Sequence, residues 1–167
     1  MIGIGGVSMS ALAIHLQAKG YQVRGSDRTD SERIRHLRAI GIPVSIGEDE
    51  EIREPIVVFT GAVDALQPQL TRAREAGKRL LSRAELLGAV AEEFPQVVSV
   101  AGCHGKTSTT AMLAHILAAA GKQFTCHIGG DDLTFGNYYH GGDDIFLTEA
   151  CEYQRSFLSL KSTVAVI

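Results

Sequence analysis

The sequence has no apolar run that approaches the ~20 residues needed to span a membrane. Its N-terminus also lacks the order of a secretory signal peptide, in which basic residues precede an apolar stretch and a cleavage site of small residues. These two absences predict a cytoplasmic protein that is not inserted into a membrane.

Cysteine is scarce, and no metal-binding spacing is present. The three cysteines, Cys103, Cys126 and Cys151, are widely separated and form no CxxC pair, which disfavours both a disulfide framework and a zinc knuckle. The histidines show no HxH or HExxH spacing, so we interpret His15, His36, His115 and His140 as surface or internally hydrogen-bonded residues.

An excess of positive charge is missing too. Lys and Arg number 16 against 19 Asp and Glu, a formal net charge of -3. Binding to phosphate backbones without sequence preference needs a broad positive field, so we expect no nucleic-acid partner. The composition does include 45% apolar residues and 18 glycines, which is typical of a globular protein with a large core and many tight turns.

Short apolar strands alternate with helical patterns along the chain, which predicts an α/β fold. Residues 1–94 read as a Rossmann-like open parallel sheet, in which Tyr21 to Asp27 forms an early strand. Pro95 interrupts this alternation of strands and helices. After it, a new unit begins with an apolar strand, followed by a glycine loop and a helix. We therefore expect two domains, 1–94 and 95–167, the second a partial domain that ends within the strand Thr163 to Ile167.

The glycine loop of the second domain has every part of a nucleoside triphosphate site. It follows the apolar strand from Val97 to Ala101 and precedes a helix. Such a site needs backbone N–H groups and close glycines around the phosphates, a lysine on the β- and γ-phosphates, and a hydroxyl on Mg²⁺. The strict pattern would have glycine at Val100. The residues predicted to bind ATP are Gly102, Cys103, His104, Gly105, Lys106, Thr107 and Ser108.

An acidic residue ends the later strand that begins at Ile145. In phosphate-loop enzymes a carboxylate at this place reaches Mg²⁺ directly or through water, so Glu149 is predicted to hold the metal together with Thr107. Asp144 and Glu152 are weaker candidates, which we expect at the surface.

A second glycine loop opens the chain, from Gly3 to Ser10, and Asp27 follows it at the end of the second strand. This order resembles the dinucleotide fingerprint G-x-G-x-x-G with an acid about twenty residues further on, except that Ser8 replaces the third glycine. The loop could bind the pyrophosphate of a nicotinamide cofactor, bind another diphosphate, or form a structural turn.

The two loops together resemble those of the Mur ligases of peptidoglycan synthesis. The segment from Gly3 to Ser10 is similar to the opening motif of that family, and the segment from Gly102 to Thr110 is similar to its ATP loop. The histidine before Gly105 is typical of the branch that uses L-alanine and of the related murein tripeptide ligase. Where the family usually has an aspartate, this sequence has Cys151.

The resemblance implies a reaction and its site. ATP phosphorylates the lactyl carboxylate of UDP-N-acetylmuramate, and the amine of L-alanine attacks the acyl phosphate to form an amide. Lys106 and Glu149 would be catalytic, and Mg²⁺ would lie on Thr107 and Glu149. Family members have further domains, so we expect this chain to be inactive alone. The UDP-sugar would be bound by Gly5, Gly6, Ser8, Met9, Asp27 and Thr60.

Three other functions stay open at this stage. The murein tripeptide ligase shares the same loops. A nicotinamide-binding oxidoreductase module would explain the first loop but leave the second one without a role. A regulatory nucleotide-binding module would use both loops without catalysis.

Overall fold

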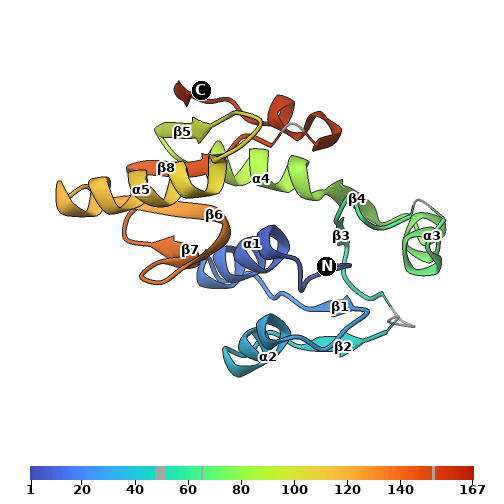
Figure 1. Ribbon diagram of the computed structural model, residues 1–167. Coiled ribbons are helices and arrows are strands. Elements are labelled where there is room, and N and C mark those ends of the chain that lie inside the picture. The colour runs from blue at the N-terminus through green and yellow to red at the C-terminus, as the bar shows by residue number, and fades with distance from the viewer. Residues whose placement is uncertain (48–51, 65, 152) are drawn as a thin grey trace. The chain divides into compact units, whose positions relative to one another are not determined.

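A computed structural model describes residues 1–47, 52–64, 66–151 and 153–167 (Figure 1). The chain divides into two compact units, Met1–Leu86 and Leu87–Ile167. Each unit combines helices with a mainly parallel sheet, so the predicted α/β class is confirmed. Within the described part of the chain, no helix has the length and apolar character to cross a membrane.

The first unit is built from two pairs of short parallel strands. β1 (Gly25–Asp27) pairs with β2 (Val44–Ile46), and β3 (Ile56–Phe59) pairs with β4 (Arg79–Ser82). Ile2 forms isolated parallel bridges with Ser26 and Phe59 and so lies between the pairs. The carboxyl ends of all these segments therefore face one edge of the sheet, where ligands bind in open α/β folds.

Three helices connect these strands: α1 (Val7–Ala18), α2 (Glu32–Ala39) and α3 (Pro68–Glu75). Ser31 caps α2, because its hydroxyl accepts a hydrogen bond from the Ile34 N–H at 3.3 Å. α3 begins with Pro68 in its first turn, and the Gln67 side chain caps it at the Leu70 N–H. The buried apolar core comprises Ile2, Ile4, Ala13, Ile34, Leu37, Ile42, Val44, Val57, Leu70 and Ala73.

Helix α4 (Arg83–Ala91) follows β4 directly and contains the boundary between the units. A capping box starts it: the Ser82 N–H donates to Glu85 Oε2 at 2.7 Å, and the Glu85 N–H donates to Ser82 Oγ at 3.2 Å. Hydrogen bonds to the Glu85 carboxylate from the backbone N–H and the side chain of Ser82 hold the pKa of Glu85 below its usual value.

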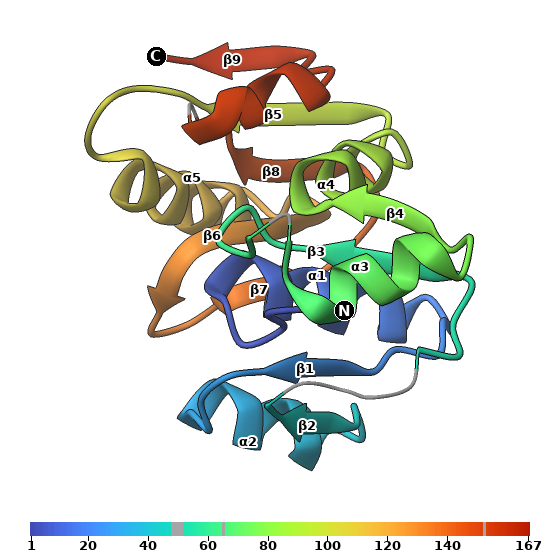
Figure 2. The same ribbon diagram turned by 90° about the vertical axis from the view of Figure 1, so that its right-hand side faces the viewer.

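The second unit is a five-stranded sheet in the order β7-β6-β8-β5-β9. Its strands are β5 (Gln96–Val100), β6 (Phe124–Asp132), β7 (Gly136–His140), β8 (Ile145–Glu149) and β9 (Val164–Val166). Helix α5 (Lys106–Ala119) lies along this sheet (Figure 2) and buries Ala114 against a core that includes Val100, Phe124 and Leu147. A 3-10 helix, η1 (Tyr153–Ser159), precedes β9.

Two strands differ from the sequence-based expectation. The strand expected from Tyr21 is limited to Gly25–Asp27, and Tyr21 is 60% exposed. At the far edge of the second sheet, β6 continues to Asp132 and turns into β7, an antiparallel strand that the sequence reasoning missed. Asp132 Oδ1 accepts the N–H groups of Thr134 and Phe135 at 2.9 and 3.0 Å, and Gly136 has a φ of 61°, so side-chain hydrogen bonds and a left-handed glycine form this turn.

Candidate functional site

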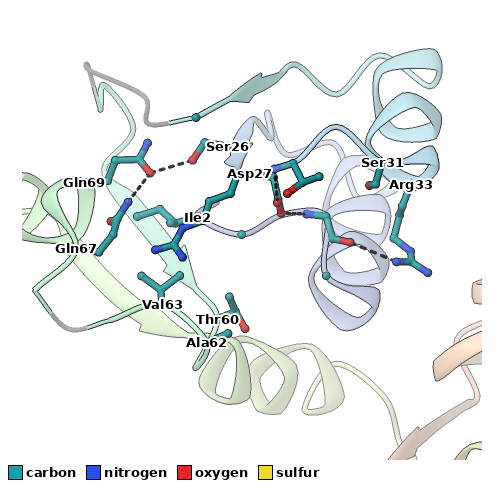
Figure 3. Close-up of a pocket in the computed structure, with 16 residues that line it drawn as sticks. Ile2, Ser26, Asp27, Ser31, Arg33, Thr60, Ala62, Val63, Gln67 and Gln69 are labelled. Atoms are coloured by element: carbon teal, nitrogen blue, oxygen red, sulfur yellow. Dashed lines mark hydrogen bonds between the residues drawn. The ribbon is translucent and has the colours of Figure 1, made fainter.

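A pocket of about 540 Å³ lies in the first unit, at the carboxyl ends of Ile2, β1 and β3 (Figure 3). Its walls come from the glycine loop, from the turn after β1, from the start of α2 and from the segment between β3 and α3. The lining residues are Ile2, Gly3, Gly5, Gly6, Ser26, Asp27, Arg28, Thr29, Ser31, Arg33, Gly47, Thr60, Ala62, Val63, Gln67 and Gln69.

The glycine loop is packed so closely that only glycine fits at two of its positions. A Cβ atom on Gly5 would lie 2.8 Å from Asp27 Oδ2 and 2.9 Å from Ile34 Cδ1. Gly3 has a φ of 75°, and a Cβ there would lie 2.6 Å from Thr60 Cγ2. The loop backbone therefore touches the side chains of Asp27 and Thr60 directly.

Asp27 is bonded to the loop itself. The Gly5 N–H donates to its Oδ2 at 2.8 Å, and the Thr29 N–H donates to its Oδ1 at 3.3 Å. On the other side of the loop, Arg33 Nη1 donates to the Gly5 carbonyl oxygen at 3.3 Å (Figure 3). The loop therefore lies between a carboxylate and a guanidinium.

The start of α1 has the character of an anion site. Its N-cap is Gly6, no side chain caps it, and the first turn carries no acidic residue. The first N–H groups of a helix have no partner within the helix, and the helix dipole favours negative charge there. A phosphate group in the pocket would meet this end of α1.

The structure places four of the six residues predicted for the UDP-sugar in this pocket: Gly5, Gly6, Asp27 and Thr60. The other two have their side chains elsewhere. Met9 is 1% exposed and belongs to the core, and the Ser8 hydroxyl accepts a hydrogen bond from Arg83 Nη1 at 3.2 Å.

The sequence reasoning missed several polar residues of the pocket. Gln69, which is 2% exposed, accepts the Ser26 hydroxyl at 3.0 Å and Gln67 Nε2 at 3.2 Å, both on its Oε1 (Figure 3). Arg28, Ser31 and Arg33 were missed as well. Position was a signal only for Arg28, which directly follows β1, and for Ser31, which caps α2; no such signal marks Arg33 or Gln69.

The predicted ATP loop lies in the second unit between β5 and α5. Gly102 has a φ of 135°, and Gly105, the N-cap of α5, has a φ of 75°. The Lys106 ammonium donates to the Gly102 carbonyl oxygen at 2.7 Å, so the lysine side chain folds back over the loop. Cys103, His104, Thr107 and Ser108 are exposed around it.

Thr107 and Glu149 both contact the same short glycine segment of β6. The Gly129 N–H donates to Glu149 Oε1 at 2.7 Å. A Cβ on Gly129 would lie 2.7 Å from the Glu149 carboxylate oxygens, and one on Gly130 would lie 3.0 Å from Thr107 Cγ2. The two glycines leave the space that the Thr107 methyl group and the Glu149 carboxylate occupy beside the loop.

A hydroxyl and a carboxylate are oxygen ligands, which suit Mg²⁺. Among the residues that the structure describes, no group of three or more His, Cys, Asp or Glu side chains could hold a metal ion. A magnesium ion at Thr107 and Glu149 would therefore complete its shell with phosphate oxygens and water, as this ion commonly does.

Of the two weaker acidic candidates, the structure describes Asp144. Asp144 is exposed immediately before β8, whereas Glu149 ends that strand, and Glu152 lies outside the described residues. All three cysteines are free thiols. Burial raises the pKa of Cys126 to about 12, so this thiol is not reactive at neutral pH.

Comparison with known proteins gives consistent matches. The sequence model described as Mur ligase family, catalytic domain, matches residues 1–95. UDP-N-acetylmuramate--L-alanine ligase of Clostridium botulinum (strain Eklund 17B / Type B) is 44% identical over 169 residues, which is 99% of this chain and 37% of the relative. The enzyme of the same name from Clostridium novyi (strain NT) is 41% identical over the same shares of the two chains. The chain thus spans little more than a third of these curated relatives.

Solved structures agree with the sequence matches. The UDP-N-acetylmuramate-alanine ligase of Thermotoga maritima is 30% identical with a TM-score of 0.87, over 98% of this chain and 39% of that one. A ligase of Neisseria meningitides, described as UDP-N-acetylmuramate:L-alanyl-gamma-D-glutamyl-meso-diaminopimelate ligase, is 27% identical with a TM-score of 0.89, over 98% of this chain and 57% of that one. Both kinds of ligase therefore share this fold.

Proposed function

Because the chain belongs to the Mur ligase family, we propose that it binds UDP-N-acetylmuramate and ATP as part of a ligase that joins L-alanine to the UDP-sugar in peptidoglycan synthesis. Relatives that carry the name of this ligase match 99% of the chain at 41% and 44% identity. The observation that carries the proposal is the presence of two different glycine loops in one chain, each before a helix and beside its own set of polar side chains.

The first loop would receive the diphosphate of the UDP-sugar. The pocket of about 540 Å³ is large enough for a nucleotide portion. The backbone from Gly5 to the start of α1 supplies N–H groups, and Asp27 and Thr60 line the same space.

The second loop would hold ATP. Lys106 would leave the Gly102 carbonyl and donate to the phosphoryl group being transferred, where its charge offsets the charge that builds up. Thr107 and Glu149 would hold Mg²⁺, which draws negative charge from the phosphates when it is bound. The substrate carboxylate would attack the γ-phosphorus, ADP would leave, and the amine of L-alanine would then displace phosphate from the acyl phosphate to form the amide.

A titration calorimetry experiment on the chain tests the proposal. UDP-N-acetylmuramate is expected to bind, and NADH, the control ligand, is not. Binding of NADH without binding of the UDP-sugar would favour the oxidoreductase module and contradict the proposal.

The murein tripeptide ligase is a second candidate, because the Neisseria ligase shares the fold at a TM-score of 0.89. The two activities differ in the amine that they use. In a ligase that also carries the family's further domains, ADP formation that depends on L-alanine supports the first, and ADP formation that depends on the tripeptide supports the second. Without either amine, hydrolysis of Mg·ATP alone would point to a regulatory module. A cytoplasmic location stays a prediction.

A further inference from the structure

We propose that Arg33 binds the ligand's diphosphate directly and determines the preference of the first-unit pocket for charged over uncharged nucleotides. This inference rests on the proposed function, since it assumes that the pocket takes a nucleoside diphosphate. Neither the fingerprint of the first loop nor the family resemblance singles out Arg33, which lies on helix α2 beyond the loop.

The need for a cation arises from Asp27. Its carboxylate lies 2.8 Å from the Gly5 nitrogen, in the part of the loop that a diphosphate would approach. Two unit charges a few ångströms apart interact strongly where water is partly excluded. An anionic ligand at this loop therefore meets repulsion from Asp27 unless a positive side chain offsets it.

Arg33 is the cation that contacts the loop at Gly5. It lines the pocket, and its Nη1 donates to the carbonyl oxygen of Gly5, the residue whose N–H group binds Asp27. That hydrogen bond is long, at 3.3 Å, and therefore weak. A guanidinium has five N–H donors in a planar fork that matches the oxygens of a phosphate group. A phosphate oxygen would be a stronger partner than the neutral carbonyl, because hydrogen bonds between charged groups are the stronger kind.

The local structure explains how Arg33 comes to lie there. Ser31 caps α2 and fixes the helix start at Glu32, so Arg33 falls in the first turn, beside the turn that follows Asp27. The next arginine on this helix has another role: Arg35 is directed to Asp30, with Nε and Oδ2 3.7 Å apart, and its side chain is 67% exposed. Arg35 therefore provides a matched control on the same helix.

Arg28 is the other cation of the pocket. It follows Asp27 in sequence and is exposed, whereas Arg33 is half-buried and bonded to the loop. An exposed charge attracts an anion only at longer range, and salt screens that attraction. Removing the Arg28 charge is therefore expected to weaken anion binding only slightly. Arg33 should therefore have the larger effect of the two.

The test is a set of calorimetric titrations with UDP and with uridine, on the unchanged chain and on the variants Arg33→Met, Arg33→Lys, Arg28→Met and Arg35→Met. Arg33→Met is expected to weaken UDP binding by about ten- to a hundredfold and to leave uridine binding unchanged. Arg33→Lys should recover part of the loss, because it keeps the charge without the fork. Arg35→Met should bind UDP as the unchanged chain does.

Two results would overturn the role of Arg33 while leaving the pocket assignment intact. Equal losses for UDP and uridine in Arg33→Met would show that the arginine only supports the loop. Unchanged UDP affinity, or a larger loss in Arg28→Met, would show that another group offsets the charge. If the unchanged chain bound neither UDP nor UDP-N-acetylmuramate, the proposed function of the pocket would itself fail, and this inference with it.

Discussion

The two glycine loops of this chain both lead into a helix, but different charged side chains bond to their backbones. In the first loop, the Asp27 carboxylate accepts the Gly5 N–H, and the Arg33 guanidinium donates to the Gly5 carbonyl oxygen. In the second loop, the Lys106 ammonium donates to the Gly102 carbonyl oxygen. Both loops precede a helix whose N-cap is a glycine without a side-chain hydrogen bond. The helix start thus provides a general anion site, and the neighbouring side chain decides which anion suits it.

The proposed magnesium site belongs to the second loop. Thr107 and Glu149 lie against Gly130 and Gly129, close to the loop that carries Lys106. The residues around the first loop are amides, hydroxyls, one carboxylate and two arginines. This difference suits a ligand that is bound and positioned at the first loop and a triphosphate that reacts at the second.

Removing the Lys106 ammonium should distinguish the ligand affinities of the two loops most clearly. Lys106→Ala is expected to lower the Mg·ATP affinity of the chain by about 100-fold or more, because the charge acts directly on the phosphates. UDP-N-acetylmuramate affinity should stay the same. Lys122→Ala, at the other end of α5, is the control and should change neither. Equal losses in both lysine variants would contradict the assigned role.

Adding one carbon to the first loop should weaken UDP-sugar binding and leave Mg·ATP binding unchanged. Gly5→Ala introduces a Cβ within 3 Å of Asp27 and Ile34, which should cost about 1–3 kcal/mol of unfolding free energy and weaken UDP-sugar binding without changing Mg·ATP binding. Both are measured by denaturant unfolding and calorimetry.

The control for this variant is Gly77→Ala. Gly77 has a φ of 66° and no atom within 4 Å of the added Cβ, so the change costs only backbone strain of about 1 kcal/mol. Its UDP-sugar affinity should match that of the unchanged chain. Normal UDP-sugar binding by Gly5→Ala would show that the loop does not contact the ligand.

Neutralising Glu149, the proposed metal ligand, is expected to have a smaller effect. Glu149→Gln keeps an oxygen that can accept the Gly129 N–H but loses the negative charge that attracts Mg²⁺. The magnesium concentration needed for half-maximal ATP binding should rise by about tenfold. Asp144→Asn, immediately before the same strand, should leave it unchanged; a similar rise there would remove Glu149 from the metal site.

A substitution at Ser82, which lies between the two loops in the sequence, should change the affinity of neither loop for its ligand. Ser82→Ala removes one half of the capping box of α4 and is expected to cost about 1 kcal/mol of stability, with both ligand affinities unchanged. Thermal unfolding measures the cost, and calorimetry measures the affinities. A loss of either affinity would mean that the start of α4 helps to position a loop.

The capping box of α4 also predicts that the stability of the chain depends slightly on pH. The folded-state pKa of Glu85 is lowered by its hydrogen bonds to Ser82, so this stabilisation is present above the unfolded-state pKa of about 4.3 and is lost as the pH falls through the folded value. Glu85→Gln should reduce the fall in stability between neutral and acidic pH. An unchanged pH profile would contradict the lowered pKa.

The parts of the fold that the sequence predicts are those set by local patterns. The apolar run of β3 and the glycine stops of the helices identify the α/β order, and the glycine loops identify where phosphates would bind. The hairpin of β6 and β7 was missed because its turn depends on Asp132 bonding to Thr134 and Phe135, a short contact that apolar periodicity does not report.

The candidate sites show the same division. Gly5, Asp27, Lys106 and Glu149 are recognisable because each stands next to a strand or a glycine. Gln69 and Arg33 could not be found in this way, since their place in the pocket depends on how α3 and α2 pack after their caps at Gln67 and Ser31. A buried amide and a half-buried arginine look like ordinary polar helix residues until the helices are in position.

The central claim is that the two loops bind different phosphates by different means, and one measurement tests it most directly. UDP-N-acetylmuramate and Mg·ATP are titrated separately into the unchanged chain, Gly5→Ala and Lys106→Ala. We predict that Gly5→Ala loses affinity only for the UDP-sugar and that Lys106→Ala loses affinity only for Mg·ATP. Loss of both ligands in either variant, or the reverse assignment, would contradict the account.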